Sequence, residues 1–378
     1  PAIIPRDFID RKSKSDLLAG TNIPVIYLTN YNNPFTWQET YQTIVDLKPD
    51  LVIFQWAIAL QGLPMGYIIR KLSAHSTIET MIDLHLVVQK EASSIDKWFS
   101  DYGLKAPQSY IAHAYKTVAE LKELYPAQRF LVNETGERAT DGAKTVIKLF
   151  HPVYDIFKPV DSFDVEAAKK ALHLRKHVFL FFGFIRKYKG LHHVIPAFQK
   201  VAAVRDDVSL LIVGESFWNT LDASRFSTRF KKAVFGSLKK LLLKNSDNEE
   251  DYQPLDLIKT LKLEDRVTVI NEFVPNEDVH RYFQVSDAIL TYYLTATPSG
   301  VESIAYNFNM PVLATNVGHF PETVKHGFNG YLAEPENIDS MAEMMLKFLD
   351  HPIDRSHVAE TSRNMSWDQY AKAILNRK

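Results

Sequence analysis

Three cations stand at one predicted strand-to-helix turn. Arg186, Lys187 and Lys189 follow the apolar run 177–185, which predicts a buried strand, and a helix is expected from Leu191. A lysine provides a mobile point charge and an arginine a two-pronged donor, so this set suits a diphosphate. Cations placed there could stabilise the charge that grows on a departing nucleoside diphosphate. The same residues also fit an ordinary solvated loop.

A second candidate phosphate site lies further along the chain. Two apolar runs, 288–293 and 310–317, predict strands, and the helix between them is expected to begin at Gly300. The turn of such a βαβ unit leaves the backbone N–H groups of Ser299, Gly300 and Val301 free at the positive end of the helix dipole, where a phosphate is stabilised. A glycine also lets a ligand approach the backbone closely. The pattern is equally that of an ordinary βα turn.

The elements that would position these residues alternate along the whole chain. Runs 23–28, 51–55, 80–88, 109–113, 208–214 and 266–274 predict further strands, and stretches 38–47, 63–72, 117–124, 338–349 and 367–375 predict helices. This alternation implies parallel sheets covered on both faces, with ligands beyond the carboxyl ends of the strands. Gln55, Trp56 and His85 lie at or just after such ends. His85 fits a residue that faces a ligand, and it also fits a histidine satisfied in the core.

Length and composition exclude several classes of protein. With 378 residues the chain is long enough for two domains, and 44 Lys+Arg against 45 Asp+Glu gives no overall charge for binding nucleic acid. The absence of cysteine excludes disulfides and thiolate metal sites, and it fits a reducing compartment. No apolar run approaches the roughly 18 residues that span a bilayer. The chain opens with polar residues and without Met, which suggests a truncated, processed or partial N-terminus.

One segment of the second half differs from its surroundings. Residues 224–244 contain seven cations and no acid, and Phe226, Phe230, Val234 and Leu238 recur at intervals of four. This pattern predicts a basic amphipathic helix in an insertion. The helix could dock on an anionic membrane surface, or its apolar stripe could pack on the second domain while the lysines are solvated.

The segment around the second phosphate site resembles family 4 glycosyltransferases, which have the two-domain GT-B architecture. Seven residues match their pattern P-V-(I/V)-A-(T/S)-x-x-G-G-x-P-E, with His319 in place of the second glycine, and 329–332 continue it as N-G-Y-L; the seven are Pro311, Val312, Ala314, Thr315, Gly318, Pro321 and Glu322. The glutamates of the family's E-x7-E pattern are absent from their places, and Glu302 lies nearby but out of register. The family motif G-R-x-x-x-x-K-G is matched by Gly183, Lys189 and Gly190, with Arg186 two residues beyond the arginine position.

The resemblance extends to the first half and implies a fold. Residues 83–91 keep His85 and Glu91 of the family pattern H-N-x-x-P-H-E. The implied fold class is α/β, GT-B, with two Rossmann-like domains whose parallel sheets face each other across a cleft. We expect an acceptor-side domain over 1–159, a nucleotide-sugar-binding domain over 160–365, and a C-terminal helix over 366–378 that crosses back to the first domain. The family's glycine-rich loop after the first strand is not found, so the first β-α-β unit is expected to be missing.

The function that the resemblance implies is hexosyl transfer from a nucleoside-diphosphate sugar to an acceptor hydroxyl, with retention and without a metal or other cofactor. The acceptor would be a polysaccharide, glycolipid or lipid-linked oligosaccharide, and the enzyme would be cytoplasmic, either free or peripheral on the inner face of the membrane. Two alternatives stay open: a catalytically silent GT-B subunit that scaffolds a polysaccharide assembly complex, and a sugar-nucleotide epimerase. The implied site residues fall into three groups. They are catalytic His85, Arg186 and Lys189; donor-binding Gly183, Lys189, Ser299, Gly300, Val301 and Glu302; and acceptor-side Gln55, Trp56 and Glu91.

Overall fold

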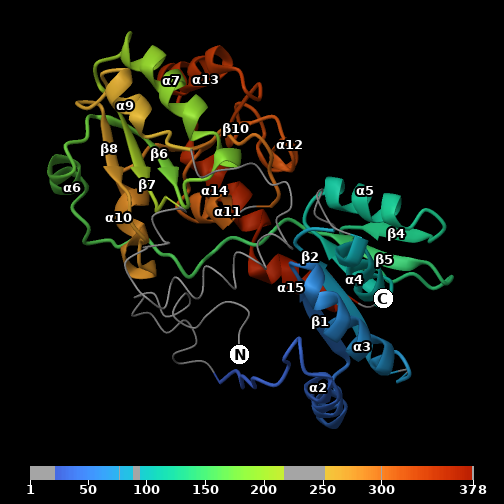
Figure 1. Cartoon of the computed structure of the whole chain (residues 1–378). Coiled ribbons are helices and arrows are strands. Elements are labelled where there is room, and N and C mark those ends of the chain that lie inside the picture. Colours follow the sequence, from blue (N-terminus) through green and yellow to red (C-terminus); the bar gives the residue numbers. More distant parts are fainter. Residues whose placement is uncertain (1–21, 76, 88–93, 217–251, 299, 377–378) are drawn as a thin grey trace. The chain divides into compact units, whose positions relative to one another are not determined.

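The computed structural model describes residues 22–75, 77–87, 94–216, 252–298 and 300–376 (Figure 1). Within these ranges the chain forms two compact units. Unit 1 contains residues 22–151 and 367–376, and unit 2 contains residues 152–366. No helix in the described ranges is both long and apolar enough to cross a bilayer. Each unit has its own parallel sheet, as the alternation of strands and helices predicts.

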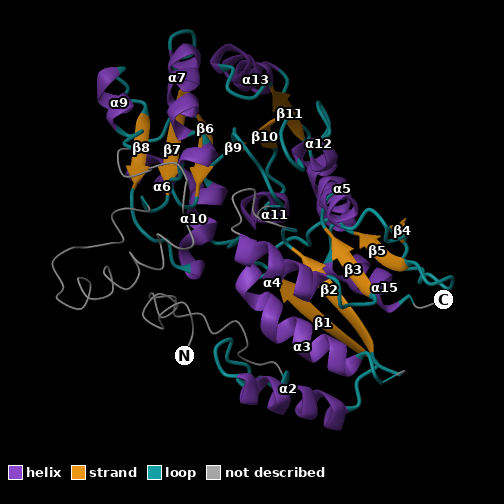
Figure 2. Cartoon of the chain, turned by 45° about the vertical axis from the view of Figure 1, so that its right-hand side comes forward, coloured by secondary structure: helices purple, strands orange, loops and turns teal. Residues whose placement is uncertain are grey.

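The sheet of unit 1 has five parallel strands in the order β1-β2-β3-β5-β4 (Figure 2). The predicted strands near 51–55, 80–88 and 109–113 are confirmed; the first is one residue longer than its apolar run, and the other two end earlier than theirs. Two strands were not predicted from the sequence, because they are short and flank a polar loop. The strands are β1 (Leu51–Trp56), β2 (Glu79–Leu84), β3 (Ser109–Ala112), β4 (Phe130–Asn133) and β5 (Lys144–Lys148).

Alternate residues of these strands point into two separate cores. One core holds Ile82, Tyr110 and Val146 together with side chains of α3, α4 and α5. The other holds the neighbouring residues of the same strands, and α15 covers it through Ile374. The sheet is therefore covered on both faces, as parallel sheets require. The helices of unit 1 are α2 (Pro34–Leu47), α3 (Gly62–Leu72), α4 (Ser94–Leu104), α5 (Tyr115–Leu124) and α15 (Trp367–Leu375), with a 3₁₀ turn η1 (Ala59–Gln61).

The prediction of a strand over 23–28 is wrong. The structure assigns no regular element to these residues, and the side chains of Ile23, Val25, Ile26 and Tyr27 are all exposed. A short apolar run becomes a strand only where a neighbouring strand pairs with it, and β1 pairs with β2 alone in the described sheet. The local pattern of the run was that of a strand, but it has no pairing partner in the described chain.

The sheet of unit 2 has six parallel strands in the order β11-β10-β9-β6-β7-β8. The predicted strands beginning near 177, 208, 266, 288 and 310 are confirmed, with tighter bounds. Successive strands run outward from β6 through β7 to β8, and then from β9 through β10 to β11 on the other side. The strands are β6 (His177–Phe182), β7 (Val208–Val213), β8 (Val267–Ile270), β9 (Ala288–Thr291), β10 (Val312–Thr315) and β11 (Gly330–Ala333).

Helices cover this sheet, whose strands are mostly buried apart from β8 at one edge, which is only partly buried. The predicted helix over 338–349 is confirmed as α13 (Ile338–Asp350), whose apolar face packs against α7 (Leu191–Ala202). The helix expected from Gly300 is α11 (Gly300–Asn307), and it packs against α14 (Arg355–Asn364). The other helices are α6 (Val165–Ala171), α9 (Asp256–Thr260), α10 (Val279–Gln284) and α12 (Phe320–Thr323), with 3₁₀ turns η2 (Lys187–Lys189) and η4 (Asn276–Asp278).

Candidate active site

The strand order of unit 2 reverses between β6 and β9. In open α/β sheets the loops on either side of such a reversal separate, and ligands bind in the crevice outside the carboxyl ends of the two strands. Here the loop after β6 carries Gly183 and η2, and the loop after β9 leads to Gly300 at the start of α11. The topology therefore brings both phosphate sites predicted from the sequence to one edge of the sheet.

Gly183 lies close to side chains from both loops. Its φ of +91° lies in the left-handed region, and a Cβ built on it would lie 2.8 Å from Lys189 Nζ and 3.6 Å from Val301 Cγ2. Only a glycine leaves room for the amine of Lys189 at this position without backbone strain. The structure thus places three of the predicted donor-binding residues together, Gly183, Lys189 and Val301.

Lys189 is a buried cation. Its relative exposure is 7%, and its Nζ atom lies 3.5 Å from the carbonyl oxygen of Phe182 and 5.7 Å from the centre of the Tyr293 ring. No carboxylate of the described residues pairs with it. Burial, together with the positive charge of half-buried Arg186, lowers the pKa of Lys189 to about 8. A buried ammonium group with this setting is stabilised when an anion binds beside it.

A second glycine holds η2 against the loop that follows β9. Gly190 has a φ of +70°, and a Cβ on it would lie 2.2 Å from the carbonyl oxygen of Tyr292. The backbone N–H of Leu294 donates to the carbonyl of Tyr188 over 2.7 Å. Lys189 is therefore fixed on a short turn that is anchored to the neighbouring strand end.

The face of Gly300 is occupied by an aromatic ring of the same unit. A Cβ on Gly300 would lie 2.6 Å from Cε2 of Tyr154, whose pKa is raised by burial. The missing side chain at Gly300 is thus explained by the packing of Tyr154 in this structure. Ser299, the remaining member of the predicted turn, lies outside the described residues.

Glu302 forms a buried pair with His319. Its Oε2 atom lies 2.6 Å from His319 Nε2, and the two residues are 4% and 2% exposed. The pair joins α11 to the turn between β10 and α12. Glu302 Oε1 and His319 Nδ1 are buried without a hydrogen-bond partner. Both residues stand out in the sequence, but their contact was not predicted; the histidine at a position where the family pattern has glycine was the available signal.

Unit 1 carries a polar cluster at the carboxyl end of its own sheet. His85 Nε2 lies 2.7 Å from Gln55 Oε1, and Gln55 Nε2 donates to Asp83 over 3.1 Å. Asp83 also contacts His113 and Tyr370, which the sequence analysis did not single out. His113 directly follows β3 as His85 follows β2, so its place after a strand was a usable signal. No group of three or more His, Cys, Asp or Glu side chains within the described ranges is arranged to hold a metal ion.

The two other acceptor-side candidates differ from Gln55. The side chain of Trp56 is completely buried in the core of unit 1, where it packs with Leu104 and Ile69. It supports the end of β1 and presents no surface to solvent in this structure. Glu91 lies outside the described residues.

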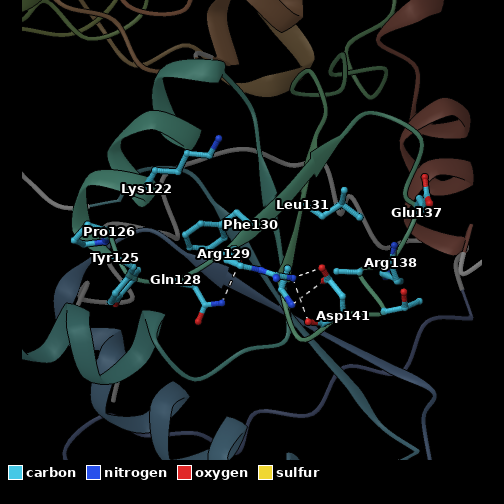
Figure 3. A pocket seen from close by; sticks show the side chains of 13 residues that line it. Lys122, Tyr125, Pro126, Gln128, Arg129, Phe130, Leu131, Glu137, Arg138 and Asp141 are labelled. Atoms are coloured by element: carbon cyan, nitrogen blue, oxygen red, sulfur yellow. Dashed lines mark hydrogen bonds and ion pairs between the residues drawn. The ribbon is translucent and has the colours of Figure 1, made fainter.

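A surface hollow of about 790 Å³ lies elsewhere in unit 1 (Figure 3). It is lined by the segments that precede β4 and β5, so it sits away from the carboxyl ends of the strands. Among its charged side chains, Arg129 pairs with Asp141, and Arg138 pairs with Glu79 on the sheet. Arg129 and Asp141 are both mostly exposed, and the hollow contains none of the predicted site residues.

A family model decides the identity of unit 2. The model described as "Glycosyl transferases group 1" matches residues 162–365, which include every described residue of the site around Lys189. The chain belongs to this family. It is 23% identical over 208 residues to spore coat protein SA of Bacillus subtilis (strain 168), covering 53% of this chain and 48% of that protein. It is 25% identical over 185 residues to N-acetyl-alpha-D-glucosaminyl L-malate synthase of Bacillus anthracis, covering 49% of this chain and 39% of that one.

This group 1 glycosyltransferase thus spans less than half the length of both curated relatives in its matches. Its fold is shared over a longer stretch with a solved structure, that of Anabaena HepE in complex with UDP-glucose. The TM-score is 0.58 at 18% identity, over 94% of this chain and 84% of that one. The predicted α/β fold of the GT-B class, with two parallel sheets, is confirmed.

Proposed function

We propose that this protein transfers a hexose from a nucleoside-diphosphate sugar to an acceptor hydroxyl, with retention of configuration and without a metal. The observation that carries the proposal is the buried ammonium group of Lys189, which lies beside Gly183 at the strand reversal and pairs with no described carboxylate. An anionic group placed there would replace the hydration that burial removes from the amine. The complex of Anabaena HepE with UDP-glucose supports a nucleotide sugar as the donor.

In this proposal eight of the predicted residues have a chemical task. Lys189 and Arg186 neutralise the diphosphate as its bond to the sugar breaks. The backbone at Gly183, Gly300 and Val301 approaches the phosphates, and His85 contacts the transferred sugar. Gln55 and Glu91 are assigned to the side of the acceptor, a glycan or a lipid-linked glycan.

Binding of the diphosphate should be linked to uptake of a proton by Lys189. Its pKa of about 8 in the free protein should rise toward the ordinary value when an anion binds, because the charged form is then stabilised. At pH 8 we expect uptake of about half a proton per diphosphate bound, and the affinity should fall as the pH rises above 8. Calorimetric titration with UDP, GDP and ADP in two buffers of different ionisation enthalpy measures this uptake. Identical heats in the two buffers, or unchanged uptake in Lys189→Met, would contradict the assignment.

One assay separates the transferase from its two alternatives. Release of free nucleoside diphosphate is measured with and without candidate acceptors, after a thermal-shift screen of UDP-, GDP- and ADP-sugars has identified the donor. A transferase releases the diphosphate in step with acceptor glycosylation. An epimerase converts the donor without an acceptor, and a silent subunit does neither.

Residues 224–244 lie outside the described part of the chain, and the proposal for them rests on their sequence. We propose that this basic amphipathic segment binds the anionic inner face of a membrane, each cation contributing about 1 kcal/mol near the surface. The protein should sediment with anionic liposomes, less so as salt increases, and not with neutral ones. Changing Lys231, Lys232, Lys239 and Lys240 to Glu should abolish sedimentation and leave turnover of a soluble acceptor intact. Equal partitioning of both proteins would end the membrane proposal.

A further inference from the structure

The polar cluster of unit 1 is organised around the carboxylate of Asp83, at the carboxyl end of β2. Its Oδ1 atom lies 2.7 Å from His113 Nε2, and its Oδ2 atom accepts from Tyr370 O–H over 2.8 Å and from Gln55 Nε2 over 3.1 Å. Asp83 is 4% exposed and His113 is 2% exposed. Three groups, from β1, from the residue after β3 and from α15, thus converge on one buried carboxylate.

Asp83 is ionised in this setting. Burial raises its pKa, but the hydrogen bond and the charge of His113, with the hydrogen bond from Tyr370, bring the pKa below its usual value. His113 Nδ1 lies 3.2 Å from the carbonyl oxygen of Leu149, which can only accept. Both ring nitrogens of His113 therefore face oxygen atoms that can accept a hydrogen bond. An ionised Asp83 is in turn an acceptor at each of its oxygens.

The charge on Asp83 determines the orientation of the Gln55 amide. A carboxylate oxygen cannot donate, so the Gln55 atom that faces it is the NH₂ group, and the carbonyl Oε1 must point the other way. That oxygen lies 2.7 Å from His85 Nε2. Since an amide oxygen only accepts, His85 Nε2 must be the nitrogen that carries the proton.

We propose that Asp83, held by His113 and Tyr370, acts through Gln55 to fix His85 in its Nε2–H tautomer, so that His85 Nδ1 presents a lone pair to a sugar hydroxyl. Asp83, Gln55, His113 and Tyr370 are positioning residues in this arrangement. The inference rests on the proposed function only for the identity of the hydroxyl; the tautomer is a property of unit 1 by itself.

The surroundings of His85 are consistent with a neutral ring. Burial lowers the pKa of His85, Asp83 opposes this effect, and the charge of His113 adds to it. The rings of His113 and His151 lie 5.5 and 6.0 Å from that of His85, centre to centre. His85 Nδ1 makes no hydrogen bond to the part of the chain that the structure describes. A neutral imidazole with one bare nitrogen can accept a hydroxyl proton, which an imidazolium cannot.

The test is the tautomer itself, observed without substrate. Two-bond ¹H–¹⁵N spectra of histidine-labelled full-length protein at pH 8 distinguish protonated from bare ring nitrogens, and His85→Gln identifies the signals. We expect the wild type to show a protonated Nε2 and a bare Nδ1 at His85. In Asp83→Asn the Gln55 amide is free to turn, so both nitrogens should shift toward an averaged tautomer, although Asp83 makes no hydrogen bond to His85 among the described residues.

Two further variants keep the test decisive. Asp46→Asn is the matched control, because exposed Asp46 accepts from Gln42 over 3.0 Å in the same unit; it should leave His85 unchanged. Gln55→Leu replaces an exposed side chain and should fold even if Asp83→Asn does not; it should give the same averaging. A Nδ1–H or averaged tautomer in the wild type would overturn the proposal, as would an unchanged tautomer in either folded variant.

Transfer measurements separate this inference from the proposed function. Gln55→Leu should lower kcat by roughly tenfold while the affinity for the nucleoside diphosphate is unchanged, because the diphosphate is assigned to unit 2. If no nucleotide sugar is ever turned over, the proposed function fails and the tautomer measurement still stands. If transfer proceeds without the Nε2–H tautomer, this inference alone fails.

Discussion

Replacing Lys189 by methionine is expected to lower kcat/KM by about 100-fold, equivalent to about 3 kcal/mol of lost stabilisation of the departing diphosphate. The same change should not destabilise unit 2. Folding places the Lys189 ammonium group in a buried site that lowers its pKa to about 8, so below pH 8 the charge opposes folding by up to about 3 kcal/mol. Methionine removes that cost and fills a similar volume.

Loss of activity together with unchanged or higher thermal stability is the signature of a functional cation. Thermal unfolding and steady-state kinetics on the same preparations measure both quantities. Lys200→Met is the matched control, because the Lys200 side chain lies half exposed on α7 of the same unit, where it pairs with Asp339 over 2.6 Å. The control should change neither quantity by much, since exposed pairs contribute little. Near-wild-type turnover in Lys189→Met would remove Lys189 from the mechanism.

Of the substitutions proposed for this protein, those that break the Glu302–His319 pair should produce the largest loss of stability. In Glu302→Leu the ring of His319 stays buried without its partner, and we expect the free energy of unfolding of unit 2 to fall by about 3–5 kcal/mol. Replacing both residues by leucine should restore most of this loss, because two apolar side chains then fill the space that the pair occupied. Urea unfolding of the two single variants and the double variant gives the coupling energy.

The control for this cycle is Glu343→Leu, an exposed glutamate on α13 whose replacement should change stability by less than about 0.5 kcal/mol. Additive losses in the Glu302 and His319 variants would show that the contact does not hold α11 to the turn after β10. Nucleotide binding by the double variant then reports whether Glu302 is also needed for the donor.

A strand could be predicted from the sequence where its own residues determine it, and could not where pairing with a distant strand determines it. The strands β6, β9 and β10 lie in continuous apolar runs that are bounded by glycine or proline. Apolar composition and these bounding residues were therefore enough to locate the strands. The run 23–28 has the same local character and no partner strand in the described chain. β4 was missed for the opposite reason: it is short and only partly buried, and its pairing with β5 determines it more than its composition does.

The candidate site shows the same division. Cations after β6 are visible in the sequence as a diphosphate site, but the burial of Lys189 against Gly183 depends on the order of strands that are far apart in sequence. The contacts of Asp83 are even harder to predict from the sequence. Tyr370 reaches it across 287 residues of chain, and His113 across 30, so no local pattern could join them.

The placement of α15 has a consequence for synthesis of the protein. The described part of unit 1 consists of two segments of the chain, one before unit 2 and one after it. During synthesis the residues of unit 2 are therefore all present while unit 1 still lacks α15. All of 152–366 is therefore synthesised before Ile374, which covers the sheet face formed by Met81, Ile111 and Ile147. A nascent chain should therefore keep that apolar face uncovered until α15 has been synthesised.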